Sequence, residues 1–318
     1  MKIWIEKADV SPIILGGKSL FMRRLADEFR KRYDISVVSE GKADISLNVI
    51  GIKHNQSKKK ILRLDGVWHD TRKLWRRKNK ALKNSMNQAD GVIYQSNFAR
   101  RMCDIFLGEP KCPTKVIFNG SDPTVYDNVK SECFFNKPVF LACSKWRPHK
   151  RLRDIIESFL LANISNSALI VVGDIANSGI SKKEMSNYVY HHNIFYHGKV
   201  HQNVLISILK SVTASIHLCW FDACPNSVVE AIVAGVPVIC NNTGGTWEIV
   251  GPSGGIICTV DEPYNFKPVD LYNPPSINRD CIADALIRCS EDQIQITRDH
   301  VLIKNIADQY LSFIESLL

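Results

Sequence analysis

Short apolar runs alternate with amphipathic stretches along the first part of the chain. The apolar runs at 2–8, 35–39, 45–50, 58–66, 91–96 and 111–122 have the length and composition of strands, and helical periodicity marks 15–32, 71–89 and 97–107. Strands that alternate with helices form βαβ units, in which helices cover a parallel sheet. The pattern therefore predicts an α/β domain at the N-terminus.

The periodicity lapses near 131–138, and a second series of the same kind follows. Its strands are predicted at 139–144, 168–174, 194–200, 214–220 and 236–242, and its helices at 151–162, 181–192, 204–212 and 227–235. The segment 261–278 is rich in Pro and Asn and is predicted to be a loop before two final helices. We predict two open α/β domains with a cleft between them, where ligands gather at the carboxyl ends of the strands.

Length and composition agree with two domains in a protein without a membrane span. The chain has 318 residues, of which 45% are hydrophobic, enough for two domains of ordinary size. Glu6, Lys7 and Asp9 interrupt the N-terminal apolar run, which therefore lacks the core of a signal peptide. Because no window reaches the roughly 18 uncharged apolar residues of a spanning helix, we expect a cytoplasmic protein.

The residues that usually hold metals are not arranged as ligands. The ten cysteines include no C-x-x-C pair, and several lie in apolar runs, which predicts reduced and mostly buried thiols. The sequence also contains no Asp-x-Asp triplet, the usual two-carboxylate grip on a divalent metal. We therefore expect no metal and no other cofactor.

Positive charge is concentrated in the first half. Residues 1–135 contain 26 Lys and Arg against 15 Asp and Glu, a balance of +11, and the remainder has 15 against 17, or −2. In the predicted helix 71–89, six of the basic residues are assigned to one face, namely Arg72, Lys73, Arg76, Arg77, Lys80 and Lys83. They form either a solvated helix face or a surface for an anionic membrane or an acidic acceptor. No nucleic-acid-binding motif accompanies them, so nucleic acid is not an expected partner.

Two glycine and lysine segments are candidates for binding an anion. Gly16 and Gly17 open the first predicted helix, but Pro12 stands where a P-loop needs its first glycine. They remain either a turn or a place where a ligand approaches the helix N-terminus. The segment CSKWRPHKRL places four cations, Lys145, Arg147, Lys150 and Arg151, directly after a strand. It is either a diphosphate site or a solvated basic turn.

The segment 222–250 contains two acids and a glycine pair around a short helix and a strand. Ser227 and Glu230 have the spacing of a capping box, in which Glu230 would only stabilise the start of the helix. That interpretation leaves unexplained why Asp222 precedes the helix and why Gly244 and Gly245 follow the next strand.

Taken together, these motifs resemble those of the retaining GT-B glycosyltransferases of family 4, the glycosyl transferases group 1. The matching pieces are Lys145 and Lys150, the E-x7-E-like pair Asp222 and Glu230, the strand GVPVI, the turn GGTWE at 244–248, IFYHGKV, and VIFNGSD at 116–122. The likeness covers nearly the whole chain and is strongest over 116–250. It implies two Rossmann-like domains that face each other across a cleft. The acceptor would bind residues 1–135 and a nucleotide sugar 136–300, and the final helix, 301–318, would return to the first domain.

The resemblance also implies roles for single residues. Glu230 would hold the ribose hydroxyls, Asp222 would contact the donor sugar, and Lys145 and Lys150 would neutralise the departing diphosphate. The backbone at Pro225, Asn226, Ser227 and Val228 would offer amides to the donor, with further donor contacts at Gly16, Gly17, His197, Gly198, Gly244 and Gly245. Preorganised cations of this kind suit a leaving nucleotide that is not held by metal.

Three departures from the family pattern affect this assignment. Asp222 replaces a glutamate, and Lys145 stands where an arginine is usual, so Arg147 is a candidate to supply the planar fork. The place of a histidine near the reacting sugar is taken by Asp65, with His69 close behind, and Asp65 is otherwise a turn residue before Gly66. The expected function is transfer of a sugar to a hydroxyl of a glycan, lipid or glycoprotein glycan. The alternatives are an inactive binder of nucleotide sugars or glycans and a nucleotide-sugar epimerase.

Overall fold

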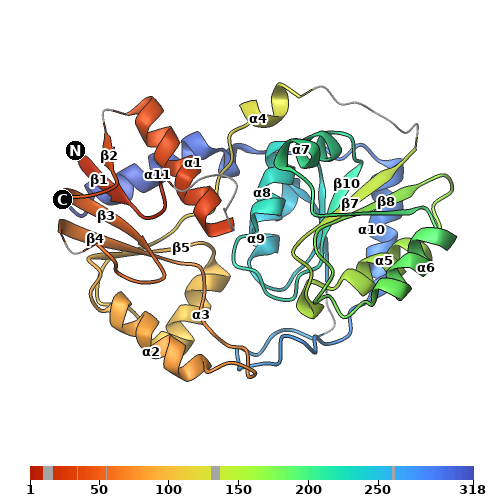
Figure 1. The fold of residues 1–318 in the computed structure, drawn as a ribbon, viewed down its shortest axis with the longest axis horizontal. Helices are drawn as coiled ribbons and strands as arrows, with labels where there is room; N and C mark the ends of the chain where they lie inside the picture. Colours follow the sequence, from red (N-terminus) through yellow and green to blue (C-terminus); the bar gives the residue numbers. More distant parts are fainter. Residues whose placement is uncertain (10–16, 34, 55, 130–136, 260–261) are drawn as a thin grey trace.

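A computed structural model describes residues 1–9, 17–33, 35–54, 56–129, 137–259 and 262–318, which fold into two parallel sheets flanked by helices (Figure 1). The first sheet has the strand order β2-β1-β3-β4-β5-β6. Its elements are β1 (Lys2–Ile5), α1 (Gly17–Arg32), β2 (Ser36–Val38), β3 (Ala43–Val49), β4 (Ser57–Leu64), α2 (Trp75–Met86), β5 (Gly91–Tyr94), α3 (Asn97–Leu107) and β6 (Thr114–Val116).

The second sheet has the order β12-β11-β10-β7-β8-β9. The short helix α4 (Thr124–Asp127) precedes it, and its strands are β7 (Val139–Cys143), β8 (Ala168–Val172), β9 (Ile194–Gly198), β10 (Ala214–His217), β11 (Val238–Asn241) and β12 (Gly255–Cys258). Its helices are α5 (Leu152–Ala162), α6 (Lys182–His191), α7 (Gln202–Lys210), α8 (Asn226–Val233), α9 (Thr246–Val250) and α10 (Arg279–Glu291). The prediction of two α/β domains is confirmed.

Each sheet is buried on both faces, as parallel sheets are. All four residues of β5 and all five of β8 are buried, because their sequences, GVIY and ALIVV, are continuous apolar runs and do not alternate with polar residues. Helices on both sides supply the facing side chains.

The last helix, α11 (Ile303–Glu315), lies against the first domain although it follows the second in sequence (Figure 1). Ile306 and Tyr310 are fully buried in the same cluster as Phe21 of α1. The Tyr310 hydroxyl accepts a hydrogen bond from Nε of Arg63, a buried residue of β4, at 3.0 Å. The chain therefore passes between the domains twice.

One predicted helix begins later than expected, and one predicted loop is confirmed. The helix predicted at 71–89 begins only at Trp75, because Asp70 forms a turn in which its carboxylate accepts from the Arg72 backbone N–H at 3.0 Å. Arg72 and Lys73 therefore precede the helix, and the guanidinium of Arg72 lies over the Tyr272 ring at 4.3 Å. Residues 262–278 contain neither helix nor strand, as predicted for this loop.

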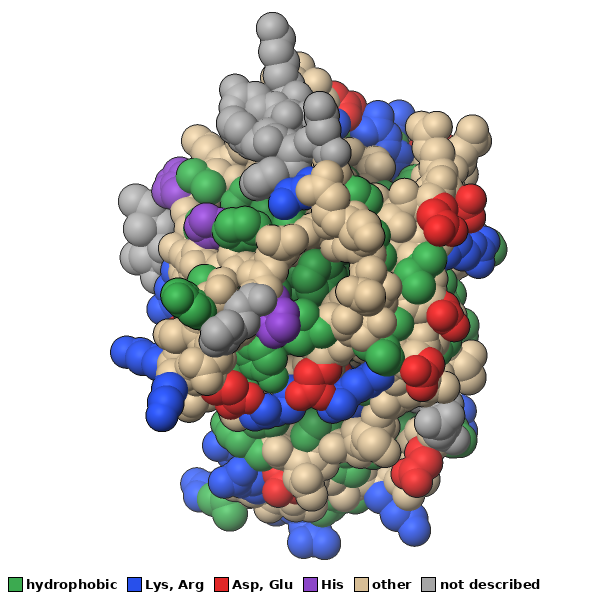
Figure 2. Space-filling view, turned by 90° about the vertical axis from the view of Figure 1, so that its right-hand side faces the viewer, with side chains coloured by type: hydrophobic (Ala, Val, Ile, Leu, Met, Phe, Trp, Pro, Cys, Tyr) green, Lys and Arg blue, Asp and Glu red, His purple; other side chains and the backbone are tan. Residues whose placement is uncertain are grey.

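On the end of the second domain that faces away from the first, the described charged side chains are of both signs. Basic and acidic side chains lie next to one another across this face, between exposed hydrophobic groups (Figure 2). Among the described helices, none is long and apolar enough to cross a membrane.

Candidate active site

A cavity of about 230 Å³ lies between the two domains, where the carboxyl ends of their strands face each other. Sequence analysis selected four of its lining residues, Asp65 from the first domain and Asp222, Pro225 and Asn226 from the second. It is also lined by Arg63, Gln95, Asn119, Ala223 and Cys224. The fold therefore brings residues that are more than 150 positions apart into one site.

Asp222 is fixed by Lys150. The Lys150 ammonium donates to Oδ2 of Asp222 at 2.6 Å, and the two side chains are 16% and 26% exposed. Burial alone would raise the pKa of Asp222, but the Lys150 charge outweighs it and the pKa is lowered. Burial likewise opposes the charge on Lys150, and Asp222 more than compensates, so the pKa of Lys150 is raised. Both groups are charged at neutral pH.

One group of side chains within the described residues has the spacing of metal ligands. His217, Cys219 and Asp222 place one ligand atom each within 4.8 Å of the others. Lys150 interacts with both the Asp222 carboxylate and the Cys219 thiol, so a fixed positive charge already occupies this neighbourhood. Burial and the Lys150 charge lower the pKa of His217 to about 3, so its ring is neutral. A cation bound by this group would therefore lie close to the positive charge of Lys150.

Arg63 and Asn119 form the floor of the cavity, and the analysis of single residues did not select either. The side chain of Arg63 is 1% exposed and donates to Oδ1 of Asn119. Nδ2 of Asn119 in turn donates to the Cys224 carbonyl at 2.9 Å and to Oδ1 of Asn226 at 2.8 Å. Arg63 thereby connects the first domain to the segment that leads into α8. The signals were an arginine inside the apolar run ILRL and the asparagine of VIFNGSD.

The capping-box interpretation of Ser227 and Glu230 is wrong. Helix α8 begins at Asn226 after Pro225, and its start has no side-chain cap, so Ser227 lies within the first turn. Oε1 of Glu230 instead accepts a hydrogen bond from Nη2 of Arg24 in α1 at 2.7 Å. Both side chains are largely buried, 13% and 15% exposed. Burial lowers the pKa of Arg24, but Glu230 and Tyr126 raise it more strongly. Glu230 therefore links the domains.

The glycine pair after β11 allows a close approach of two loops. Gly244 has φ +70°, and a Cβ there would lie 2.8 Å from the Asp222 carbonyl oxygen. A Cβ at Gly245 would lie 2.1 Å from the Ala223 carbonyl oxygen and 2.4 Å from Oγ of Ser96. The Gly245 N–H donates to the Asp222 carbonyl at 2.7 Å. These glycines thus support the backbone that carries Asp222.

Glu248, the last residue of the GGTWE turn, caps a helix of the opposite domain. Its carboxylate accepts from the backbone N–H groups of Asn97 and Phe98, both at 2.7 Å, and from Nδ2 of Asn97 at 2.9 Å. These groups lie at the N-terminus of α3, where a negative charge is stabilising. No sequence signal pointed to this contact, because a cap from 150 residues away has no local pattern.

The remaining candidates of the second domain lie outside the 230 Å³ cavity. Lys145 and Arg147 follow β7 and are exposed, and His197 and Gly198 end β9. The Gly198 carbonyl accepts from the Gly173 N–H at 2.5 Å, which brings the loops after β8 and β9 together.

Two further candidates, Arg151 and Val228, are buried in the second domain. Gly17 begins a helix, and Gly16 lies outside the described residues. Arg151 is 3% exposed and donates to the Pro275 carbonyl at 2.8 Å, so it belongs to the packing of the domain and not to an open cation cluster. Val228 is buried, 1% exposed. Gly17 is the first residue of α1, and Gly16 precedes the described part of that segment.

Asp65 and His69 have different surroundings. Asp65 lines the cavity. The His69 ring packs edge-on against Phe221, with ring centroids 4.9 Å apart, and burial lowers its pKa. Asp65 is therefore the residue of this pair that faces the candidate site.

Comparison with known proteins identifies the class. Residues 128–267 match the family model of glycosyl transferases group 1. Among solved structures, HepE from Anabaena in complex with UDP and glucose is 16% identical, covers 99% of this chain and 100% of its own, and has a TM-score of 0.67. Sucrose-phosphate synthase from Thermosynechococcus elongatus is 13% identical over 97% of this chain and 82% of its own (TM-score 0.65). A glycosyltransferase from Rickettsia africae is 15% identical over 99% and 98% (TM-score 0.63).

The chain has the GT-B fold of these solved glycosyltransferases, and its residues 128–267 match the family model of glycosyl transferases group 1. No curated protein sequence matches it. The expectation of a transferase is confirmed at the level of this class.

Proposed function

We propose that the protein transfers a sugar from a nucleotide-diphosphate sugar to a hydroxyl group, with retention of configuration and without a metal ion. The observation that carries the proposal is the cavity that joins Asp65 and Asp222 at the start of α8. HepE, which shares the fold, was solved with UDP and with UDP-glucose, so we take a uridine nucleotide as the first donor to test.

In this proposal the second domain holds the donor. The N-terminal amides of α8 and the helix dipole attract the diphosphate, and Lys150 and Lys145 add positive charge as the bond to the sugar breaks. Asp222, oriented by Lys150, contacts the donor sugar, and Glu230 accepts from the ribose hydroxyls. These charges are already in place when negative charge develops on the diphosphate. They therefore stabilise the transition state without reorganising, and this lowers the activation barrier.

The first domain presents the acceptor. Asp65 and Asp222 line the same cavity from opposite domains, and in this proposal Asp65 orients the attacking hydroxyl against the donor sugar. With the resemblance to retaining enzymes, this arrangement supports transfer with retention of configuration. Asp65→Asn is expected to lower turnover by roughly a hundredfold and to leave UDP affinity nearly unchanged.

A panel of nucleotide sugars tests the function against its alternatives. The full-length protein is incubated with each sugar nucleotide in excess chelator, first alone and then with simple glycoside acceptors, and products are followed by NMR. Slow hydrolysis or transfer with the α-anomer retained supports the proposal. Binding without turnover indicates a binding protein, an isomerised donor indicates an epimerase, and activity that requires added magnesium or manganese contradicts metal independence.

We also propose that α2 makes peripheral contact with an anionic surface. Arg76, Arg77, Lys80 and Lys83 are exposed on this helix, whereas Leu82 and Met86 pack into the first domain. Leu74, just before the helix, is 69% exposed. Basic residues beside an exposed apolar side chain favour an anionic lipid surface. Sedimentation with phosphatidylserine vesicles, but not with neutral vesicles, is the expected result.

A further inference from the structure

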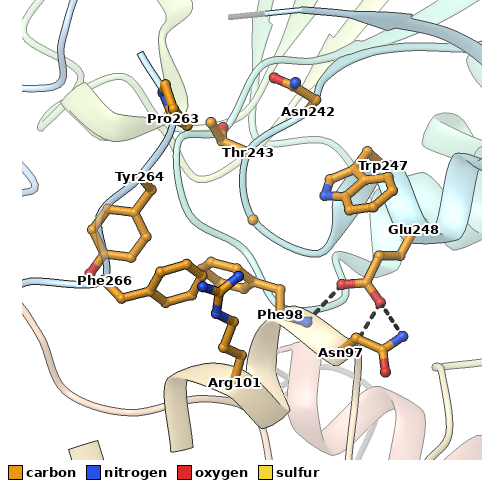
Figure 3. A pocket seen from close by; sticks show the side chains of 11 residues that line it. Asn97, Phe98, Arg101, Asn242, Thr243, Trp247, Glu248, Pro263, Tyr264 and Phe266 are labelled. Carbon is orange, nitrogen blue, oxygen red and sulfur yellow. Dashed lines mark hydrogen bonds between the residues drawn. The ribbon is translucent and has the colours of Figure 1, made fainter. Parts of the chain in front are cut away.

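A second cavity, of about 380 Å³, also lies between the domains (Figure 3). It is formed by α3 of the first domain and by segments 242–248 and 263–266 of the second. It shares none of its described lining residues with the cavity that contains Asp65 and Asp222. Gly244 lines it while packing against the Asp222 backbone. The loop after β11 therefore separates the two cavities.

Aromatic rings border this second cavity. The ring centroids of Tyr264 and Phe266 lie 5.0 Å apart, and those of Phe98 and Phe266 lie 6.0 Å apart. Trp247 is 43% exposed and lies across the cavity from Tyr264 (Figure 3). Such rings offer flat apolar surface with polar groups at their edges, which suits the C–H faces of a sugar ring.

Two polar groups in the cavity have unused hydrogen-bonding capacity. The side chain of Thr243 is buried, its residue being 6% exposed, and its hydroxyl has no hydrogen-bond partner. The guanidinium of Arg101 lies 4.1 Å from the centroid of the Phe266 ring and has no carboxylate partner among the described residues. A buried hydroxyl without a partner costs free energy, so a ligand that bonds to it is favoured.

The charge balance of the cavity favours an anion. The carboxylate of Glu248 also lines it, but its oxygens accept three hydrogen bonds from Asn97 and Phe98 at the start of α3 (Figure 3). Its charge is thus offset by the helix N-terminus. Arg101 is the one basic side chain in the described lining, and it is not offset in this way.

We propose that this cavity is a binding site for a sugar unit that carries a negatively charged group, separate from the site of sugar transfer. The ring packs between Trp247 and Tyr264, the hydroxyl of Thr243 bonds to a sugar hydroxyl, and Arg101 pairs with the charged group. That group is a phosphate or a carboxylate, which a guanidinium binds in the same planar geometry. Because the ligand contacts both domains, it stabilises the arrangement seen here.

The test is calorimetric titration of the full-length protein with four probes: glucose 6-phosphate, glucuronate, glucose and inorganic phosphate. Each titration is repeated with saturating UDP, which occupies the proposed donor site. We expect the phosphorylated sugar, the uronate or both to bind in either condition, with roughly tenfold or higher affinity than glucose or phosphate. If only one of the two binds, it identifies the charged group, and if both bind, the site accepts either group.

Variants locate the site. Arg101→Gln is expected to weaken binding by roughly tenfold or more, and Thr243→Val by several-fold. Arg100→Gln is the matched control, because Arg100 is the adjacent residue of α3, pairs with Asp104 at 3.7 Å and does not line the cavity; it should bind normally. Equal binding of inorganic phosphate, normal binding by Arg101→Gln, full competition by UDP, or no binding of either charged sugar overturns the proposal. Failure of UDP itself to bind counts against the proposed transfer function and leaves this measurement intact.

Discussion

Nη2 of Arg24 and Oε1 of Glu230, 2.7 Å apart, join the first helix of one domain to helix α8 of the other. Both side chains are largely buried, so water cannot take the place of either partner when the other is removed. A charged group left unpaired in such a place costs more than the net gain from the pair. This contact therefore contributes to the stability of the whole chain.

Arg24→Gln is expected to lower the free energy of unfolding by about 1–3 kcal/mol, since Glu230 loses a hydrogen bond from a charged group. Its control is Arg23→Gln, one position earlier in α1. Arg23 pairs with Asp27 at 3.6 Å where the side chains are 34% and 56% exposed, so its loss is expected to cost about 1 kcal/mol or less. Urea unfolding of both variants measures the difference. Equal losses would show that the interdomain pair is energetically unimportant.

Glu230→Gln separates stability from ligand binding. Both Glu230→Gln and Arg24→Gln break the same ion pair, but only the first removes the carboxylate proposed to hold the ribose. We expect Glu230→Gln to weaken UDP binding by roughly 10- to 150-fold, the equivalent of a charged hydrogen bond or two. Arg24→Gln should change UDP binding about threefold or less. If the two variants bind UDP alike, Glu230 acts through the domain contact and not on the ribose.

The fold could be predicted from sequence because its signals are local. Apolar runs such as ALIVV have the length of a β-strand and are too short for a helix of ordinary length. They alternate with segments of helical periodicity through both domains. The start of α2 was predicted four residues too early, because the side chain of Asp70 competes for the backbone there.

The candidate site was only partly accessible from sequence. Asp65 and Asp222 were selected through the resemblance to the family pattern, and both follow strands whose carboxyl ends meet at the cleft. The partners of Glu230 and Glu248 could not be predicted, since a pairing across 150 or 200 residues leaves no local pattern. For Ser227 and Glu230 the sequence suggested a local contact that does not form. A capping-box spacing is only a local preference, and Arg24 provides a stronger partner for the Glu230 carboxylate.

Lys150→Met is expected to lower turnover of a nucleotide sugar by roughly a hundredfold. The ammonium that orients Asp222 is removed together with charge near the proposed diphosphate site, and Asp222 is left without its partner. Lys145→Met, at an exposed position, should instead weaken UDP binding modestly and in a salt-dependent way. Lys183→Met, on the exposed face of α6, serves as the control for loss of a surface charge. Steady-state kinetics at two salt concentrations distinguish these effects. Turnover that survives Lys150→Met would remove Lys150 from the reaction.

Acid should destabilise the protein through two buried histidines. Burial, followed by the nearby Lys150 charge, lowers the pKa of His149 and of His217 to about 3 from an ordinary 6.5. Between these values the unfolded chain binds protons that the folded chain does not, so stability falls as pH falls from about 6.5 toward 3. From pH 7 to pH 5 the free energy of unfolding should drop by on the order of 1–2 kcal/mol for each histidine.

His217→Gln tests whether the buried histidines cause this acid sensitivity. Between pH 7 and pH 5 its free energy of unfolding should fall by less than that of the wild type, and the difference should equal the contribution of one histidine. Ile216→Val, the neighbouring buried position in β10, controls for destabilisation without loss of a titratable group and should keep the full drop. Urea unfolding at the two pH values gives both numbers. An unchanged drop in the His217→Gln protein would place the acid sensitivity elsewhere.

Gly245→Ala tests whether the turn after β11 positions the candidate site. Gly245 has φ −98°, which alanine adopts without strain, so the added methyl acts only through its contacts. Those contacts, 2.1 Å to the Ala223 carbonyl oxygen and 2.4 Å to Oγ of Ser96, are too short, and the backbone next to Asp222 must move. Because a displacement of about 1 Å in a catalytic group can cost a hundredfold, turnover should fall much more than stability.

The control is Gly235→Ala, which has the opposite character. Gly235 has φ +80° with nothing within 4 Å of an added Cβ, so alanine there is strained but touches nothing. It should cost about 1–2 kcal/mol of stability and leave turnover at the wild-type level. Thermal unfolding and kcat are measured for both proteins. If Gly245→Ala keeps wild-type kcat, or if Gly235→Ala loses it equally, the turn does not act by holding Asp222 in place.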